Sequence, residues 1–365
     1  MVDFLDLRRQ GLRLEPGLRE AFSRVLRGGT FILGEEVRRL EEEFASYLGA
    51  GHAVGTASGT DALLLSLKAL GIGPGDEVVV PALTAPPTVV AVCLSGARPA
   101  LVDVDGDTLT IDPAGVEAAL GPQTRAVLPV HLYGNPAPLG QLSGLCEERG
   151  MVLVEDACQA HGAALEQRPL GTWGRCGCFS FYPTKNLGAL GDGGMVVTDD
   201  GDLAERLRSL RDYGRRGRDL LEEVGMNSRL DELQAAFLRV KLPLLEEWNR
   251  RRRELAERYS AGLQGLPLRM PAMPDGSLSA RHLFVVLTPR RDALARHLAE
   301  EGIGTAVHYP LPIHLHPAFA FLGHGEGDFP RAEQAASQVL SLPLYPELEE
   351  GEVDAVISSL SGFFS

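Results

Sequence analysis

Long apolar runs are absent from this chain of 365 residues. No uninterrupted apolar stretch approaches the roughly 20 residues that a membrane-spanning helix needs. The opening segment, Met1 to Asp6, contains neither the basic region nor the apolar region of a secretory signal peptide. We therefore expect no membrane association and a location in the cytoplasm.

Positive charge is also scarce. The chain has 35 lysines and arginines against 49 aspartates and glutamates, which gives a formal net charge of −14. Proteins that bind nucleic acid need a basic face to neutralise phosphate groups, and the sequence has no basic helix-turn-helix pattern. We expect no nucleic-acid partner, although one local basic pocket for a phosphorylated ligand remains compatible with this balance.

Cysteine is too sparse and too irregular for a disulfide framework, because the chain has five cysteines, an odd number. Cys176 and Cys178 stand two positions apart, but no second Cys or His pair lies at ligand spacing. We expect reduced, buried cysteines and no metal.

What the chain does have is the composition of a globular protein, with 44% hydrophobic and 23% charged residues. A chain of this length is too long to fold around a single hydrophobic core of ordinary size. We expect a large domain over residues 1–245, which holds the site, and a smaller α/β domain over residues 246–365. No internal repeat or low-complexity tail is found.

Short valine- and leucine-rich strands alternate with helices through the large domain. This alternation predicts a mostly parallel sheet covered by helices on both faces. The expected strands are 52–56, 77–80, 100–103, 125–130, 151–155, 178–182 and 195–198, and the expected helices include 16–26, 35–48, 61–70, 88–94, 113–120, 139–149, 292–301, 332–340 and 352–360.

Polar residues follow five of the expected strands. Because ligands of open α/β sheets bind along the carboxyl edge of the strands, these residues predict one site. They are Thr56 to Thr60, Thr84, His131, Asp156, and Ser180 with Lys185.

Two of these positions suit a phosphorylated aromatic ligand. Ser58, Gly59 and Thr60 open a helix, whose free N–H groups and dipole favour a phosphate; an ordinary helix cap is the alternative. Asp156 ends an apolar strand, where it could pair with a protonated ring nitrogen; a buried structural aspartate is the alternative.

The stretch from Cys178 to Thr198 predicts a strand, a glycine-rich loop with one lysine, and a second strand. We expect Gly191, Gly193 and Gly194 to adopt positive φ. Partial burial would lower the pKa of Lys185 and favour the neutral amine, which forms a Schiff base with an aldehyde. A salt-bridged surface lysine is the alternative.

This stretch resembles the lysine loop of the DegT/DnrJ/EryC1/StrS family of sugar aminotransferases, which depend on pyridoxal 5′-phosphate (PLP). The loop matches the form Ser-Phe-Tyr-Pro-x-Lys-Asn-Leu-Gly-x-x-Gly-Asp-Gly-Gly. The resemblance covers nearly the whole chain, through Phe4–Leu7, Gly59–Ala62, His131–Gly134, Glu155–Gly162 and Asn227–Glu232.

The resemblance implies the fold of aspartate aminotransferase, known as fold type I, and roles for single residues. Lys185 would carry PLP, Asp156 would hold its pyridine nitrogen, and Gln159 would lie near its phenolic oxygen. Ser180 would contact the phosphate. Asn227 would reach the phosphate bound by a partner subunit, which implies a homodimer with shared active sites; a helix cap is the alternative for Asn227.

One departure from the family concerns the residue that stacks on the PLP ring. After Thr84 the family usually has an aromatic residue, whereas this chain has Ala85, Pro86 and Pro87. Either a smaller apolar residue covers the ring, or another group such as His131 does.

The resemblance also implies the reaction, a transfer of nitrogen from glutamate to a nucleotide-linked keto-sugar. The form of the lysine loop, with His308, Tyr309 and His314, is similar to the branch that aminates C3, and a dTDP-linked 3-keto-6-deoxyhexose is the expected acceptor; a UDP-linked 3-keto or 4-keto sugar is the alternative. We expect His308, Tyr309 and His314 to contact the substrate. Arg215, in the basic segment from Arg211 to Arg218, is expected to meet the diphosphate, with a solvated loop as the alternative.

Two other classes of protein are the alternatives to an aminotransferase. A PLP-dependent sugar dehydratase would have histidine in place of Lys185, and a non-catalytic regulator of DNA would need the basic region that is lacking.

Overall fold

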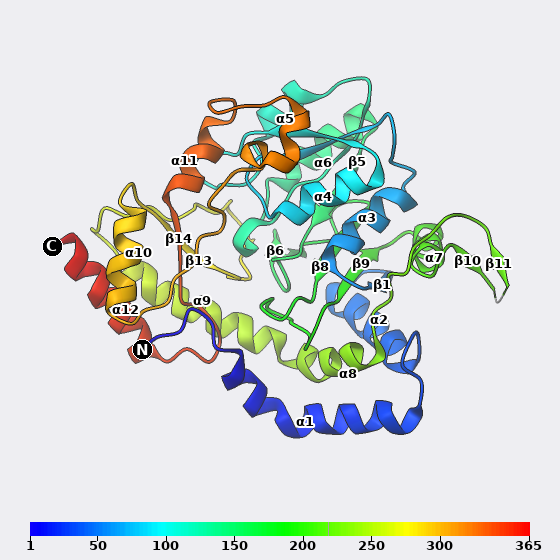
Figure 1. Cartoon of the computed structure of the whole chain (residues 1–365), viewed down its shortest axis with the longest axis horizontal. Coiled ribbons are helices and arrows are strands. Elements are labelled where there is room, and N and C mark those ends of the chain that lie inside the picture. The colour runs from blue at the N-terminus through cyan, green and yellow to red at the C-terminus, as the bar shows by residue number, and fades with distance from the viewer. Residues whose placement is uncertain (218) are drawn as a thin grey trace.

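A seven-stranded sheet forms the centre of the computed structural model, which describes residues 1–217 and 219–365 (Figure 1). The strand order is β1-β9-β8-β5-β4-β2-β3. Strand β9 is antiparallel to both of its neighbours, and the remaining neighbours pair in parallel. The strands are β1 (His52–Thr56), β2 (Glu77–Pro81), β3 (Arg98–Val102), β4 (Thr124–Val127), β5 (Val152–Asp156), β8 (Cys176–Ser180) and β9 (Gly194–Thr198).

Helices cover both faces of this sheet. Alternate residues of a strand point to opposite faces, so Val78 and Val80 join one core cluster while Val79 joins the other. The expected mostly parallel α/β sheet between helices is confirmed. One face is covered by α3 (Gly59–Ala69), α4 (Pro86–Ser95) and α7 (Gly201–Leu210), and the other by α2 (Glu35–Leu48), α5 (Pro113–Ala119), α6 (Leu139–Arg149) and α8 (Glu232–Lys241).

A separate core lies at the C-terminal end of the chain. Its strands β13 (Phe284–Leu287) and β14 (Val339–Leu342) pair antiparallel. Val2, from the other end of the chain, packs into the same core. We propose that the smaller domain begins near residue 246, and the start of α9 next to it supports this boundary. The helices that contribute to this core are α9 (Leu245–Gly262), α10 (Arg291–Glu300) and α12 (Glu350–Phe364).

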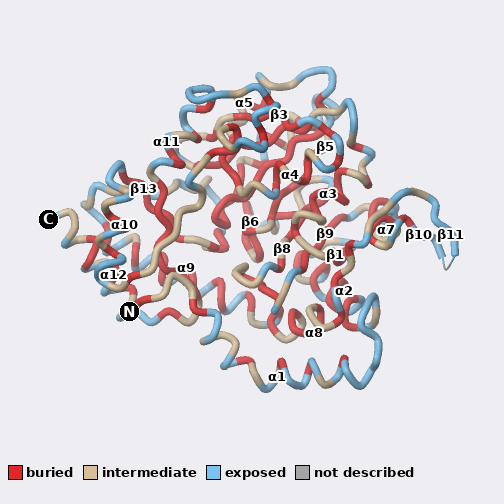
Figure 2. Tube along the Cα trace, in the orientation of Figure 1, coloured by how far each residue is buried: buried red, intermediate tan, exposed pale blue. Residues whose placement is uncertain are grey.

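Shorter elements connect and flank these cores. The hairpin of β10 and β11 projects from the body of the molecule (Figures 1 and 2). These elements are β6 (Ala164–Leu165), β7 (Arg168–Pro169), β10 (Arg215–Arg216), β11 (Leu220–Leu221), β12 (Ser277–Leu278), α11 (Pro330–Gln338) and the 3₁₀ turns η1 (Leu132–Gly134), η2 (Leu242–Leu244), η3 (Ile313–Leu315) and η4 (Pro317–Leu322).

Two of the expected helices differ from those observed. The first helix, α1 (Leu7–Gly28), begins nine residues before Pro16, because the side chain of Asp6 accepts a hydrogen bond from the N–H of Arg8 and caps it. The expected helix over 332–340 ends early, since residues 339–342 pair with β13 as a strand.

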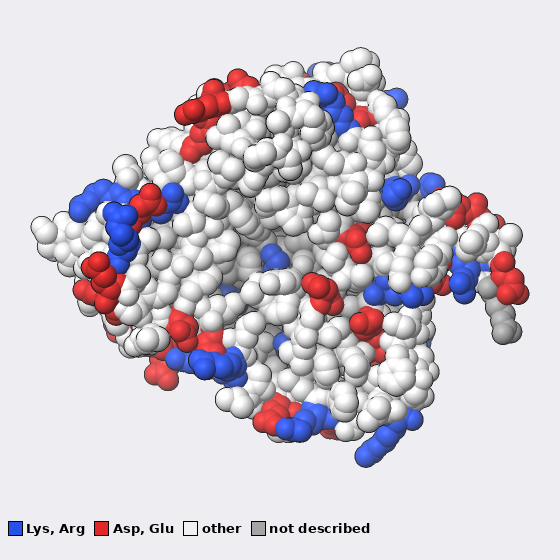
Figure 3. Space-filling model, viewed as in Figure 1, with Lys and Arg blue, Asp and Glu red and all other residues white. Residues whose placement is uncertain are grey.

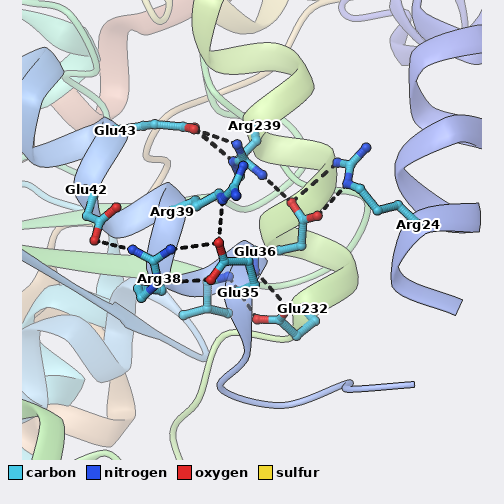
Figure 4. A network of polar contacts seen from close by, with 10 residues as sticks. Arg24, Glu35, Glu36, Arg38, Arg39, Glu42, Glu43, Glu232 and Arg239 are labelled. Atoms are coloured by element: carbon cyan, nitrogen blue, oxygen red, sulfur yellow. Dashed lines mark hydrogen bonds and ion pairs between the residues drawn. The ribbon is translucent and has the colours of Figure 1, made fainter. Parts of the chain in front are cut away.

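The start of α2 is held by a carboxylate from α8 (Figure 4). Glu232 is buried, and its oxygens accept hydrogen bonds from the backbone N–H groups of Gly34, Glu36 and Val37, each at 2.9 Å. A negative charge at a helix N-terminus is stabilising. This contact locks the segment that carries Asn227 against the body of the large domain.

Candidate active site

A cavity of about 400 Å³ opens at the carboxyl edge of the sheet. The face in Figure 3 has a hollow at its centre, with basic side-chain atoms visible inside it and few charged residues around it. The cavity is lined by nine of the expected site residues, namely Ser58, Gly59, Thr60, Asp156, Gln159, Ser180, Lys185, His308 and Tyr309.

The N-terminus of α3 forms one end of the cavity. Ser58 caps the helix, because its Oγ accepts a hydrogen bond of 3.1 Å from the N–H of Asp61. A Cβ on Gly59 would lie 2.6 Å from the Cβ of Ser180 and 2.9 Å from Sγ of Cys158. Only glycine therefore allows the helix to approach the strand that precedes the lysine loop. The free N–H groups at the start of α3 and the hydroxyl of Ser180 lie close together, an arrangement that suits a phosphate.

A serine from the Asn227–Glu232 segment braces this seat. Oγ of Ser228 donates to Oδ2 of Asp61 at 2.8 Å and accepts from the N–H of Ala57 at 3.1 Å. Ser228 is fully buried. The segment therefore fixes both the turn before α3 and the first turn of α3.

Lys185 stands in the middle of the cavity wall. Burial lowers the pKa of its amine, and the neighbouring Cys158 and Asp156 oppose that shift. The glycines of its loop act differently from the expectation, because Gly191, Gly193 and Gly194 do not adopt positive φ. They serve close approach instead, since a Cβ on Gly194 would lie 2.3 Å from the carbonyl oxygen of Ser58.

Asp156 ends β5 and is only 4% exposed. One of its oxygens accepts a hydrogen bond of 2.7 Å from the hydroxyl of Thr88, and the other accepts from the N–H of Cys158 at 3.1 Å. Thr88 is in turn hydrogen-bonded to Thr84 at 3.0 Å. These contacts hold the carboxylate in one orientation beside the cavity that also contains Lys185.

His131 is not among the residues that line the cavity, and its backbone N–H donates a hydrogen bond of 3.1 Å to the carbonyl oxygen of Asp156. Its Nδ1 accepts a hydrogen bond from the N–H of Ala137, so its Nε2 is the donor to Glu155 at 3.0 Å. The residues that line the cavity at the position of the missing aromatic residue are Ala85, Pro86 and Pro87.

The side chain of Gln159 bridges Tyr133 and Tyr309. Its Oε1 accepts from the N–H of Tyr133 at 2.8 Å, and its Nε2 donates to the hydroxyl of Tyr309 at 3.2 Å. His308 and Tyr309 both line the cavity. Burial raises the pKa of the Tyr309 phenol and lowers the pKa of the His308 ring to about 4, so both side chains are neutral near pH 7.

Three expected site residues lie away from this cavity in the single chain. His314 is buried, and its Nε2 is hydrogen-bonded to Glu333 at 2.9 Å. Arg215 is exposed on the projecting hairpin, 3.7 Å from Asp212. Asn227 is exposed and forms an antiparallel bridge with Asp212. Arg218, at the end of the same basic segment, lies outside the described residues.

The structure also adds residues that the sequence did not point to. Thr88 stands in the first turn of the helix after Thr84, a position at which its hydroxyl could have been expected to face the strand ends. Thr184 immediately precedes Lys185 in the lysine loop. His282 lies two residues before β13, and no local signal in the sequence links it to Lys185, but it lines the cavity.

The residues present fit PLP. The partly buried amine of Lys185 and the buried carboxylate of Asp156 line one cavity, and the N-terminus of α3, with Ser180 beside it, opens into the same cavity. Across the described residues, no group of three His, Cys, Asp or Glu side chains could hold a metal ion, and no helix is long and apolar enough to cross a membrane. The fold and the site together define an aminotransferase of the PLP-dependent kind.

The chain belongs to the DegT/DnrJ/EryC1/StrS aminotransferase family, whose model matches residues 14–361. It is 50% identical over 360 residues to the dTDP-3-amino-3,4,6-trideoxy-alpha-D-glucose transaminase of Streptomyces venezuelae, over 98% of this chain and 95% of that protein. It is 44% identical to the UDP-N-acetyl-3-dehydro-alpha-D-glucosamine 3-aminotransferase of Acidithiobacillus ferrooxidans, over 96% of this chain and 95% of that protein. The crystal structure of S. venezuelae DesV in complex with a ketimine intermediate matches the fold with a TM-score of 0.98 at 49% identity, over 100% of this chain and 98% of that one.

Proposed function

We propose that this enzyme transfers an amino group from glutamate to C3 of a nucleotide-linked keto-sugar, with a dTDP-linked 3-keto-6-deoxyhexose as the acceptor. The observation that carries this proposal is the shared cavity of Lys185 and Asp156 in a chain that is 50% identical, over nearly its whole length, to a dTDP-sugar 3-transaminase. A UDP-linked 3-keto sugar is the second candidate, which the 44% identity to a UDP-sugar 3-aminotransferase favours.

Lys185 is the proposed acid–base residue. Bound PLP supplies an electron sink for the pair that is left when the α-proton of the amino donor is removed. Nζ of Lys185 would take that proton, hold it as an ammonium and then release it, and in the second half-reaction it would move a proton in the reverse direction. Its lowered pKa suits both tasks, because a neutral amine accepts a proton and the resulting ammonium returns it.

Asp156 is the proposed partner of the pyridine nitrogen. Thr88 and the N–H of Cys158 hold the carboxylate in place, so that an ion pair with the protonated ring costs little reorganisation. Ser58, Gly59, Thr60 and Ser180 would bind the phosphate, and Nε2 of Gln159 retains a second N–H for the phenolic oxygen. His308 and Tyr309 would face the sugar.

Absorbance tests the proposed chemistry. The covalent bond between Lys185 and PLP absorbs visible light, so the purified protein should be coloured, should bleach on addition of glutamate, and should lose the band in Lys185→Ala. A wild-type protein that stays colourless with added PLP would rule the enzyme reading out.

Product analysis tests the position of transfer. The enzyme is incubated with glutamate and a small panel of dTDP- and UDP-linked 3-keto and 4-keto sugars, and the new amine is located by NMR. Amination at C3 of the dTDP-linked acceptor is the expected result. Amination at C4 would overturn the proposal.

We also propose a homodimer in which Asn227 completes the partner's phosphate seat. The long helix α1 lies along one edge of the molecule and exposes apolar side chains, among them Leu12 (71% exposed) and Phe22 (Figures 1 and 2). A groove beside α1 is lined by Leu12, Phe22, Phe237 and Leu190, and Leu190 belongs to the lysine loop. A second copy seated there would cover this apolar surface next to the site.

A mixing experiment separates shared sites from independent ones. Lys185→Ala and Asn227→Ala chains are purified separately, mixed and re-associated. If each Asn227 serves the partner's site, a mixed dimer has one site with both defects and one site with neither, so activity rises above that of Asn227→Ala alone. Equal activities before and after mixing would place Asn227 in its own chain's site.

We propose a location in the cytoplasm. The five cysteines are free, as expected in a reducing compartment.

Lys185 occupies the position at which a dehydratase of this fold would have histidine, so amino transfer is the favoured reaction.

A further inference from the structure

His282 lies between two cavities. It is 7% exposed and lines both the cavity of Lys185 and a neighbouring cavity of about 360 Å³. Thr184, Leu283 and His308 line both cavities as well. The proposed reaction assigns no role to His282, although its ring lines the cavity of Lys185.

The protonation of the ring follows from a chain of two buried amides. Nδ2 of Asn249 donates to the carbonyl oxygen of His161 at 2.7 Å, so Oδ1 of Asn249 is the free acceptor. Nδ2 of Asn186 donates to that Oδ1 at 2.8 Å and to the carbonyl oxygen of Ala280 at 2.7 Å. Because backbone carbonyls only accept, turning either amide over would bring two oxygen atoms together.

Oδ1 of Asn186 must then be the acceptor that faces Nδ1 of His282 at 3.1 Å. The hydrogen is on Nδ1, and Nε2 has a bare lone pair. Burial, followed by the charge of Lys185, holds the pKa of the ring well below its usual value. His282 is thus a neutral ring in one fixed tautomer.

Nε2 of His282 has no hydrogen-bond partner in the described part of the chain, and it is not among the enclosed polar atoms. It is therefore accessible from the cavities that the residue lines. A bare lone pair attracts a hydroxyl or amine donor and repels the oxygens of a carboxylate.

We propose that Nε2 of His282 accepts a hydrogen bond from a hydroxyl group of the sugar substrate and determines specificity for the sugar half-reaction only. The inference rests on the proposed function. A sugar offers hydroxyl donors, whereas the carboxylates of a dicarboxylic amino donor are acceptors and gain nothing from this nitrogen. The two half-reactions share one cavity but differ in their need for His282.

His282→Phe tests this asymmetry, because it keeps a ring of similar shape and removes both nitrogens. The expected result is a KM for the nucleotide keto-sugar about tenfold higher, with the rate of bleaching by glutamate within about twofold of wild type. Equal losses in both half-reactions, or an unchanged KM for the sugar, would overturn the inference.

Asn249→Ala is the matched control. It breaks the same amide chain at its far end and leaves Nε2 in place, so it should lower thermal stability and change both half-reactions by the same factor. A selective rise in the KM for the sugar in Asn249→Ala would overturn the inference, because it would mean that the amide chain acts by positioning the cavity wall and not through Nε2 of His282.

Substrate analogues identify the hydroxyl. A keto-sugar that lacks the contacted hydroxyl should bind about tenfold more weakly to wild type and lose nothing further in His282→Phe. If every deoxy analogue loses the same additional factor in the variant, the inference fails.

Nitrogen NMR provides a readout that is independent of turnover. In the PLP-loaded enzyme with ¹⁵N-labelled histidine, the signals lost in His282→Phe should be those of a neutral ring with hydrogen on Nδ1. A ring with hydrogen on Nε2, or a charged ring near pH 7, contradicts the inference even where amination is normal. A wild-type enzyme that aminates no nucleotide keto-sugar but shows the expected tautomer would overturn the proposed function, and the sugar contact with it.

Discussion

Glu155 and Asp156 are neighbours at the end of one strand, but their carboxylates differ in how many hydrogen bonds they accept. Glu155 is fully buried and accepts hydrogen bonds from the N–H groups of Gly171, Trp173 and Gly174 and from His131. Asp156 accepts two from the residues that the structure describes, one from Thr88 and one from the N–H of Cys158, and it lines the cavity. A carboxylate has about four lone-pair sites. The carboxylate whose sites are all occupied is structural, and the one with sites remaining is available to a ligand.

The largest effect is expected from Asp156→Asn. The amide keeps the shape but removes the charge that is proposed to pair with the ring nitrogen of PLP, so kcat should fall by about 10²- to 10³-fold. The melting temperature of the cofactor-free protein should change little. Steady-state kinetics and thermal melts check this, and a fall in stability without a fall in kcat would reverse the comparison.

Glu155→Gln should show the opposite pattern. One oxygen is replaced by an NH₂ group that faces backbone N–H donors, which should lower the free energy of unfolding by about 2–3 kcal/mol. Denaturant unfolding measures this loss. The folded fraction should keep a kcat within about threefold of wild type, and a larger loss of kcat would mean that Glu155 also serves the chemistry.

A smaller effect is expected from Gly59→Ala. The added Cβ would meet Ser180 and Cys158 within 2.9 Å and push α3 away from the lysine loop, so the Kd for PLP should rise by about tenfold. Gly140→Ala is the matched control, since its Cβ meets nothing within 4 Å in helix α6. Fluorescence titration of the cofactor-free proteins compares the two, and equal affinities would show that the approach of α3 does not set phosphate binding.

The smallest effect concerns pH and the stability of the cofactor-free protein. Burial lowers the pKa of Lys185 in the folded state, so between that pKa and the ordinary lysine pKa the unfolded chain binds more protons, and stability rises with pH. Lys185→Met should therefore be more stable than wild type at neutral pH, and the difference should shrink as the pH rises through this window. Lys68→Met, on helix α3, controls for the loss of a positive charge, and a difference that is independent of pH would argue against a buried cation.

The sheet could be predicted because its signals are local. Each strand is a short run of branched apolar residues between turn residues, and the expected bounds lie within a few residues of those observed. The edge of the sheet follows from the same alternation, which predicts that Ser58, Asp156, Ser180 and Lys185 lie close together, and these four residues line one cavity.

The errors come from long-range packing. Residues 339–342 form a strand because β13 is available to pair with them, and no local pattern reports that partner. Thr88 and His282 belong to the site because α4 and the smaller domain pack against the strand ends. In the lysine loop, the sequence suggests that the glycines are needed for positive φ, whereas the real constraint is the space left by Leu230 at Gly193 and by Ser58 at Gly194.

The segment from Ser228 to Glu232 is fastened at two points, to the first turn of α3 by Ser228 and to the first turn of α2 by Glu232. Asn227 immediately precedes it. If Asn227 contacts the phosphate bound by a partner subunit, as proposed, this segment links cofactor binding to subunit association: PLP should tighten the dimer by the same factor by which dimerisation tightens PLP binding. Dilution would then release cofactor and subunits together.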